Sequence, residues 1–231
     1  MTSPTTARNV VVTGGSSGLG AAVAAELHAA ADNVFVLDVR EPESGLPHLV
    51  VDLGRTREAE DAVRKASVEL GGIDAVVTCA GTDRCGKLAD VPGDEWDQVV
   101  QVNLLGTAAV VRAALPDLRE RHGRIVTVAS TLGLRVLSDA SAYCASKFGV
   151  VGLTRALAVE LAGEVGVTML VPGGMDTAFF DGRDEQYRPG PDAQLNQPDN
   201  VARAVRFALD QPPGCEVREL IVTPSTEPSW P

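Results

Sequence analysis

Short apolar runs alternate with longer segments along the whole chain. The runs are rich in valine and show no polar alternation; they cover residues 10–12, 34–37, 49–51, 73–77, 124–129, 167–170 and 219–222. Such runs are typical of strands buried on both faces, which occur in parallel sheets. We therefore expect a parallel sheet covered by helices on both sides.

Segments with helical periodicity separate most of these runs. They span residues 19–31, 56–70, 94–121, 142–161 and 198–209, and Pro198 suits a first helical position. The alternation predicts an α/β chain: a single Rossmann-type, doubly wound domain over residues 1–231 with a mainly parallel seven-stranded sheet. The irregular stretch 174–197 is expected to be a substrate-binding loop or else disordered, and the proline-rich tail "PSTEPSWP" should not extend the sheet.

Composition narrows the possible partners. The hydrophobic and charged shares of 45% and 22% are ordinary for a soluble globular protein. The 20 basic against 31 acidic residues give a net charge of −11, which argues against nucleic-acid binding. The start "MTSPTTARN" is polar and lacks the apolar core of a signal peptide, so none is expected, and no apolar run approaches the roughly 20 residues of a membrane helix. We expect a cytoplasmic protein with no membrane association.

The four cysteines show no CxxC spacing, and three of them lie in or beside apolar runs. Buried free thiols in a reducing compartment are therefore expected, and neither a disulfide framework nor a metal site.

Polar residues follow the apolar runs at the points where strands should end. They are Thr13, Asp38, Asp52, Thr78 and Ser130. Because ligands of doubly wound sheets bind beyond the carboxyl ends of the strands, these residues outline a candidate site.

The segment "TGGSSGLG" follows the first run and holds Gly14, Gly18 and Gly20. Glycines here permit a tight turn and let the backbone approach a pyrophosphate at the start of the next helix. A plain glycine-rich turn is the alternative, but the position between a strand and an alanine-rich helix favours dinucleotide binding.

Two acidic residues are candidates for the adenosine half of that cofactor. Asp38 lies 18 positions past Gly20, where a carboxylate accepts both ribose hydroxyls and repels a 2′-phosphate. NAD is therefore the expected cofactor, while Arg40 nearby keeps NADP open as the alternative. Asp52 is a candidate for the adenine edge, and either aspartate could instead cap a turn.

Asn103 lies in a helical stripe with otherwise mainly apolar residues. The stripe comprises Trp96, Val99, Val100, Asn103, Thr107 and Val110. An inward-facing amide must find hydrogen-bond partners, so a structural role and a functional one are both open.

The stretch "SAYCASKFG" places Tyr143 and Lys147 one helical turn apart, 13 residues or more beyond Ser130. An ammonium beside a phenol lowers its pKa from about 10 towards the working range, so that the phenol can exchange a proton with a carbonyl or alcohol. Taken alone, the pair reads more simply as an incidental contact on a helix surface.

Together these motifs resemble the classical short-chain dehydrogenase/reductase (SDR) family over nearly the whole chain. "TGGSSGLG" resembles its TGxxxGxG loop, "YCASK" its YxxxK pair, "NLLG" its helical asparagine segment, and "PGGMDT" (172–177) its segment bordering the nicotinamide. Ser130 stands where the family has its catalytic serine. The family's NNAG reads "TCAG" at 78–81, so the bracing amides are missing while backbone and Gly81 contacts are expected to remain.

The resemblance implies a role for each catalytic candidate. Tyr143 would be the proton donor and acceptor, and Lys147 would lower its pKa and hold the nicotinamide ribose. Ser130 would bind the substrate oxygen, and Asn103 would hold a water that links Lys147 to solvent. The implied cofactor contacts are Gly14, Ser16, Ser17, Gly18, Leu19, Gly20, Asp38, Asp52, Leu53, Ala80, Gly81, Tyr143, Lys147, Pro172, Gly173 and Thr177.

The implied activity is hydride transfer between NAD(P) and a carbonyl compound or secondary alcohol of low molecular mass. A non-catalytic dinucleotide-sensing regulator is one alternative, although it would not need Ser130, Tyr143 and Lys147 together. A reductase of carrier-protein-bound 3-oxoacyl groups is another. It would need a basic docking surface, for which the candidates are Arg112, Arg119, Arg121 and Arg124.

The two longest helical segments carry more apolar and small residues than one core stripe needs. A homodimer or homotetramer formed through these helices is therefore expected, as is common in the family. The surplus residues include Ala108, Val111, Leu153 and Ala156.

Overall fold

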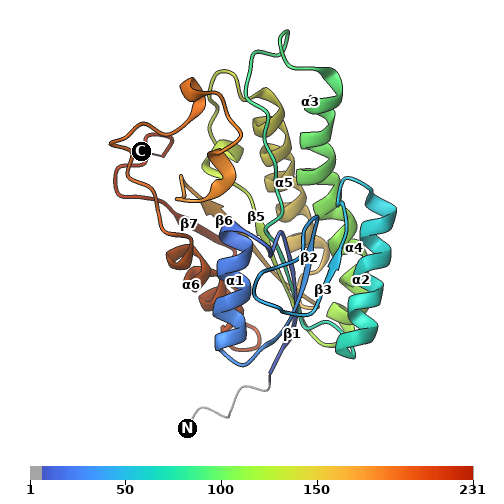
Figure 1. Cartoon of the computed structure of the whole chain (residues 1–231). Helices are drawn as coiled ribbons and strands as arrows, with labels where there is room; N and C mark the ends of the chain where they lie inside the picture. The colour runs from blue at the N-terminus through green and yellow to red at the C-terminus, as the bar shows by residue number, and fades with distance from the viewer. Residues whose placement is uncertain (1–6, 231) are drawn as a thin grey trace.

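The computed structural model describes residues 7–230, in which seven strands form one sheet (Figure 1). The expectation that no signal peptide is present concerns residues 1–9, most of which lie outside this range. The strand order is β3-β2-β1-β4-β5-β6-β7, and every pairing is parallel. The strands are β1 (Asn9–Thr13), β2 (Asn33–Asp38), β3 (His48–Val50), β4 (Ala75–Thr78), β5 (Arg124–Val128), β6 (Gly166–Pro172) and β7 (Glu219–Val222).

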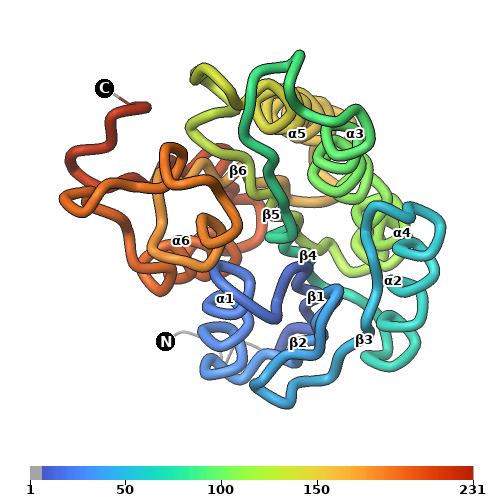
Figure 2. Tube along the Cα trace, turned by 45° about the horizontal axis from the view of Figure 1, so that its top comes forward, coloured from blue at the N-terminus to red at the C-terminus, as the bar shows by residue number. Residues whose placement is uncertain are grey.

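Helices cover both faces of this sheet, as Figures 1 and 2 show. Successive residues of a strand point to opposite faces: Val10 and Val12 pack with α1 and α6, whereas Val11 packs with α2, α4 and α5. Both faces are thus apolar, which explains the unbroken valine runs and confirms the doubly wound Rossmann-type fold. The α-helices are α1 (Gly18–Ala29), α2 (Thr56–Leu70), α3 (Gly93–Val100), α4 (Thr107–Glu120), α5 (Ser141–Glu160) and α6 (Pro198–Leu209).

The long helix expected over residues 94–121 is interrupted. A π-helical turn, Gln101–Gly106, separates α3 from α4 and contains the buried residue Asn103. The Thr107 hydroxyl donates to the Asn103 carbonyl at 2.8 Å, so a side chain supplies a bond to this wider turn. The periodicity of 3.6 residues does not reveal such a turn, and π turns are frequent at functional sites.

The strand order reverses direction between β1 and β4. Thr13 at the end of β1 lies in register with Leu37 of β2 on one side and Thr78 of β4 on the other. The loops that follow these strands therefore diverge at the carboxyl edge of the sheet and leave a crevice there.

One helical stretch is more apolar over its length than the short apolar runs of the sequence suggest. Among the described residues, Gly93–Glu120, with 28 residues, is long and apolar enough to cross a membrane by length and composition alone. A core helix of a soluble protein passes the same test. This stretch packs against the sheet through residues such as Ala109, Val110, Ala114 and Leu118, so its apolar character is accounted for by the core.

The cysteines are free thiols, but they are less uniformly buried than expected. Cys144 is buried, Cys79 and Cys85 are half-buried, and Cys215 is exposed. The described residues hold no group of His, Cys, Asp and Glu side chains suited to a metal ion.

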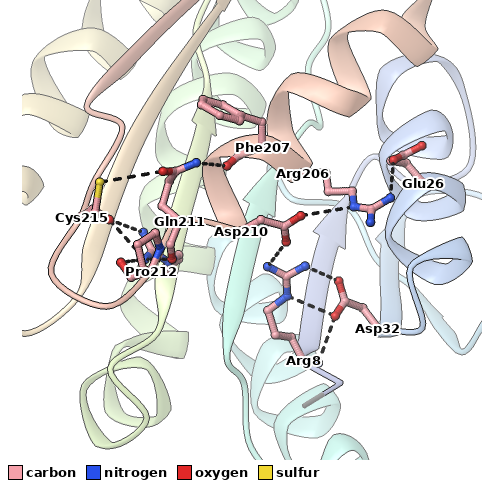
Figure 3. A network of polar contacts seen from close by, with 10 residues as sticks. Arg8, Glu26, Asp32, Arg206, Phe207, Asp210, Gln211, Pro212 and Cys215 are labelled. Atoms are coloured by element: carbon pink, nitrogen blue, oxygen red, sulfur yellow. Dashed lines mark hydrogen bonds and ion pairs between the residues drawn. The ribbon is translucent and has the colours of Figure 1, made fainter. Parts of the chain in front are cut away.

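Ion pairs join the start of β1 to α1 and α6, at the opposite edge from the crevice (Figure 3). The guanidinium of Arg8 donates to both carboxylate oxygens of Asp32, at 3.1 and 2.7 Å, and lies 2.9 Å from Asp210. Arg206 then connects Asp210 to Glu26. The network ties α1 to α6 at the edge of the sheet opposite the crevice.

Candidate active site

A cleft of about 980 Å³ opens at the carboxyl edge of the sheet, where the sequence predicts the site. Most predicted cofactor and catalytic residues line it; Ser16 and Asn103 do not, and the strand-end residues Thr13 and Thr78 are buried behind its wall. The lining residues among those predicted are Gly14, Ser17, Gly18, Leu19, Gly20, Asp38, Asp52, Leu53, Ala80, Gly81, Ser130, Tyr143, Lys147, Pro172, Gly173 and Thr177.

The glycine loop has little room for side chains. Gly14 has φ +69°, and a Cβ there would lie 2.7 Å from the Ala80 Cα; a Cβ on Gly20 would collide with the Gly14 carbonyl oxygen. Helix α1 begins at Gly18, its N-cap Ser17 makes no side-chain capping bond, and its first turn holds no acidic residue. The free N–H groups of this turn are therefore available to an anion.

Asp38 is held by the backbone at the end of β2. One carboxylate oxygen accepts from Ser16 N at 2.9 Å and the other from Arg40 N at 3.2 Å, and the residue is only 8% exposed. The exposed Arg40 side chain reaches across to the glycine loop, where Nη2 donates to the Ser17 hydroxyl at 3.2 Å. A fixed carboxylate and a guanidinium on the surface thus border the same end of the cleft.

The turn after β4, "TCAG" at 78–81, has no asparagine side chains, and other hydrogen bonds hold it in place. Ala80 N donates to the Thr13 hydroxyl at 3.2 Å, which ties the ends of β4 and β1 together. The Thr78 hydroxyl is buried and has no hydrogen-bond partner within residues 7–230. Asp52, by contrast, accepts from Gly54 N at 2.8 Å, so the turn-capping interpretation of this residue is present in the structure.

Asn103 lies behind the cleft wall with its side chain fully engaged. Its oxygen accepts from Thr82 N at 2.8 Å, and its amide donates to Thr82 O at 2.8 Å and to the Ser146 hydroxyl at 3.0 Å. The residue thereby joins the chain after β4 to α5, which supports the structural role. The role in holding a water stays a prediction.

Tyr143 and Ser130 meet at the cleft floor. Both residues line the cleft, the Ser130 side chain acts to lower the pKa of the Tyr143 phenol, and Ser130 Oγ accepts from Leu132 N at 3.1 Å. Burial nevertheless raises the pKa of Tyr143 to about 12, and Ser130 only partly opposes this shift. This result contradicts the expectation that the phenol would titrate near neutral pH, because burial outweighs the neighbouring groups.

Lys147 lies beneath the same floor and is 4% exposed. Its Nζ donates to the Val128 carbonyl at 2.8 Å and lies 5.6 Å from the centroid of the Tyr143 ring. Burial lowers the pKa of this ammonium to about 8. The ammonium faces the ring of Tyr143 and is not among the groups that shift the tyrosine's pKa, so the expected lowering is absent here.

The segment after β6 covers Tyr143 and contains residues that sequence analysis missed. The ring centroid of Phe179 lies 5.7 Å from that of Tyr143, and the Arg183 guanidinium lies 5.0 Å from the Phe179 ring. Arg183 Nη2 also donates to Asp83 at 2.7 Å, across the cleft. Asp83 lies two residues past Gly81, in the loop after a predicted strand, and this position was the only sequence feature that pointed to it. No sequence feature pointed to Arg183.

The tail also borders the cleft, through Glu227, Pro228 and Ser229. Glu227 Oε2 accepts from Gly174 N at 2.7 Å, within the segment 172–177 expected to border the nicotinamide, and Ser229 Oγ bonds the Thr131 hydroxyl at 2.8 Å. Although burial opposes it, hydrogen bonds from Ser229 and Gly174 hold the pKa of Glu227 below its usual value. The proline content of the tail gave no indication of these contacts.

Comparisons with known proteins agree with this arrangement. The sequence profile of a family described as short chain dehydrogenase matches residues 8–188. An uncharacterized oxidoreductase of Staphylococcus aureus (strain MW2) is 34% identical, over 93% of this chain and 96% of its own. Ligand-free Thermoplasma acidophilum aldohexose dehydrogenase superposes with a TM-score of 0.83 at 26% identity, covering 93% of this chain and 91% of that one. A short chain dehydrogenase from Burkholderia cenocepacia J2315 in complex with NADP gives 0.81 at 28% identity, covering 94% and 96%.

Proposed function

The chain belongs to the short-chain dehydrogenase/reductase family of oxidoreductases, and on this basis we propose that it transfers a hydride between NAD(P) and a carbonyl compound or secondary alcohol. The observation that carries the proposal is that Ser130, Tyr143 and Lys147 line the same cleft as the glycine loop.

The residues present fit a dinucleotide. The glycines let the loop pack tightly, because side chains at Gly14 and Gly20 would collide with backbone atoms, and the uncapped start of α1 offers N–H donors to a pyrophosphate. Thr177 lies opposite Gly18, with its Cβ 3.4 Å from the position of a Cβ added there. The nicotinamide, when bound, donates or accepts the hydride.

The chain's own side chains would manage the proton and the substrate oxygen. Ser130 would donate to that oxygen, and Tyr143 would give it a proton during reduction or remove one during oxidation. Lys147 would hold the nicotinamide ribose. Since burial raises the pKa of Tyr143 to about 12, the protonated phenol suits the reducing direction at neutral pH.

We further propose that NAD is preferred over NADP. Two backbone N–H groups fix the Asp38 carboxylate, which would accept hydrogen bonds from the ribose hydroxyls and repel a 2′-phosphate. Arg40 is the opposing influence, because its guanidinium is exposed and already lies at the glycine loop. A carboxylate fixed by backbone needs no rearrangement, whereas the arginine would have to leave Ser17.

Neither alternative gains support from the geometry. A dinucleotide-sensing regulator does not need a serine–tyrosine pair placed together in the cleft. A carrier-protein docking surface would need free cations, but Arg112, Arg119 and Arg121 pair with Glu60, Glu164 and Asp74 at 3.4, 2.8 and 3.1 Å. The guanidinium of Arg124 donates to backbone carbonyls at residues 211, 212 and 215.

We also propose a homodimer or homotetramer formed through α4 and α5 and the turn between α3 and α4. Two residues first considered for this surface are corrected: Val111 is 2% exposed and belongs to the core, and Leu153 packs partly against it. Large exposed apolar side chains in these helices and that turn are Leu105, Phe148 and Val159, and Ala156 of α5 is also exposed. Light scattering that gave a clean monomer mass at micromolar concentration would contradict the proposal.

The deciding experiment replaces the tyrosine. Tyr143→Phe keeps the ring and removes the hydroxyl, so folding and cofactor binding should persist while turnover collapses. Ser130→Ala should cost about a hundredfold or more in kcat, as the loss of an oxyanion donor does. The assay follows reduced-nicotinamide absorbance over a panel of ketones and alcohols with both cofactors. Near-normal turnover by Tyr143→Phe would refute the acid–base assignment, and tight cofactor binding with no turnover on any substrate would favour the sensor.

A further inference from the structure

Above the proposed reacting centre lies a buried ion pair that the reaction does not use. Asp83 and Arg183 meet at 2.7 Å, with side chains 5% and 18% exposed. They come from loops 100 residues apart in sequence, after β4 and after β6. Both residues line the cleft that also contains Tyr143 and Ser130.

The pair leaves one donor and one acceptor without a partner. A guanidinium and a carboxylate can form two parallel bonds, through Nε and Nη2 to the two oxygens. Here only Nη2 is engaged with Asp83, whereas Arg183 Nε and Asp83 Oδ1 are buried and have no hydrogen-bond partner among the described residues. Buried polar atoms in this state are rare in folded proteins and indicate a missing partner.

The surroundings keep the guanidinium in place beside Tyr143. Its carbon lies 5.0 Å from the Phe179 ring and 4.6 Å from the Phe180 ring, and Phe179 in turn contacts Tyr143. Arg183 Nη1 donates to the Tyr187 carbonyl at 3.5 Å, while Tyr187 itself donates to Asp139 at 3.2 Å. The unpartnered atoms therefore belong to a braced wall rather than to a loose side chain.

From this geometry we propose that the pair Asp83–Arg183 recognises a neutral hydroxyl group of the substrate, close to the carbon that reacts. Both atoms are shielded from solvent in the unliganded cleft, so the two side chains must part to admit a hydroxyl, which can then donate to Asp83 Oδ1 and accept from Arg183 Nε–H at once. The substrate class is then a hydroxyketone and its corresponding diol or polyol. This inference rests on the proposed function and names the substrate class for that same site.

The other chemical classes fit less well. An apolar ketone or simple secondary alcohol would leave both polar atoms buried and unpaired, which a site built for hydrogen bonding rejects strongly. A carboxylate-bearing substrate would face the Asp83 carboxylate, and the arginine that could attract it is already neutralised. The pair carries no net charge, so its complement is a neutral group with both a donor and an acceptor.

The test compares matched substrates in the wild-type enzyme with its cofactor. Butane-2,3-diol and butane-1,3-diol are each compared with butan-2-ol, which lacks the second hydroxyl. The compound 3-hydroxybutyrate carries a carboxylate in place of that hydroxyl and tests an anionic substrate. We expect kcat/KM for the better diol to exceed that for butan-2-ol by about a hundredfold or more. Equal values for diols and butan-2-ol, or a preference for 3-hydroxybutyrate, would overturn the inference. No hydride transfer on any of them, or on the wider panel, would instead refute the proposed function.

Variants then test the pair itself. Asp83→Asn and Arg183→Met should each lower the diol-to-butan-2-ol ratio by about tenfold or more. The double variant, which buries no lone charge, serves if a single variant fails to fold, and reduced-cofactor binding reports folding independently of turnover. Asp192→Asn, an exposed aspartate of the same loop, is the matched control and should leave the ratio unchanged. If the pair variants lower kcat/KM by the same factor for the diol and for butan-2-ol, Asp83 and Arg183 only hold the loop closed, and the inference is wrong.

Discussion

Lys147 should lower the stability of the folded protein at neutral pH. Its side chain is almost completely buried, and burial lowers its pKa from 10.5 to about 8. In the unfolded chain the same ammonium is hydrated and keeps its ordinary pKa. The difference corresponds to roughly 3 kcal/mol of unfavourable free energy when the group is charged. Replacing it with the apolar side chain of similar length, Lys147→Met, should therefore stabilise the fold.

The sign and the pH window follow from proton binding. Between about 8 and 10.5, the unfolded chain binds the proton and the folded protein does not, so wild-type stability gains from rising pH in this window. Below about 8 both states are charged and the full cost of burial is present. The variant also loses the bond from Nζ to the Val128 carbonyl, worth about 1 kcal/mol. We expect a net stabilisation of about 2 kcal/mol near pH 7, which disappears as the pH approaches 10.5.

Urea denaturation of the wild type, Lys147→Met and Lys65→Met at about pH 7 and about pH 10 measures this difference. Lys65 is exposed on α2, so its replacement should change stability little at either pH. A Lys147→Met protein less stable than wild type near neutral pH, or a stabilisation that does not shrink with rising pH, would refute the assignment of burial as the cause. The variant should also lose turnover, as expected where a site retains a destabilising group for its function.

Three further outcomes are expected. Asp38→Ser should narrow the NAD preference and allow Arg40 to favour NADP, measured as kcat/KM for each cofactor; a wild type that already prefers NADP would show that Arg40 dominates. Glu227→Gln weakens the acceptor for Gly174 N and should raise KM more than it lowers kcat, and unchanged kinetics would exclude the tail from the site. Arg8→Ala should cost about 2 kcal/mol in urea denaturation by leaving the buried Asp32 carboxylate without its cation and with only the backbone N–H of residue 8, and a change near zero would contradict this.

The sheet could be predicted from sequence because burial on both faces leaves a strong signal. Strands such as "VFVL" and "VTML" need no partner information: their apolar runs are too short for helices and lie between helical segments. The strand ends then predict the cofactor side of the site, because the topology brings them to one edge. Asp38 and Ser130 were predicted at this edge only because they follow strands, and both line the cleft.

Periodicity failed where a side chain or a backbone irregularity changes the local geometry. Asn103 sits in a π turn that a continuous helix would not contain, and Val111 faces the core on the helix that follows it. A residue inserted into a helical turn rotates every later position relative to the earlier ones. Thr107 and Val110 nevertheless stay buried, as the inward stripe predicts, so what periodicity missed is the break between α3 and α4 and the core position of Val111.

The pKa of Tyr143 was misjudged because helix spacing reports neighbours and not burial. Spacing correctly places Lys147 one turn away, yet its ammonium binds the Val128 carbonyl below the ring and not the hydroxyl. The phenol is instead influenced by groups far away in sequence, Asp83 and Arg183, whose charges act on it in opposite directions. A substrate hydroxyl that engaged this ion pair would alter the field at the tyrosine as well as bind. Substrate recognition and proton transfer would then be linked through the same two residues, which helix spacing alone could not indicate.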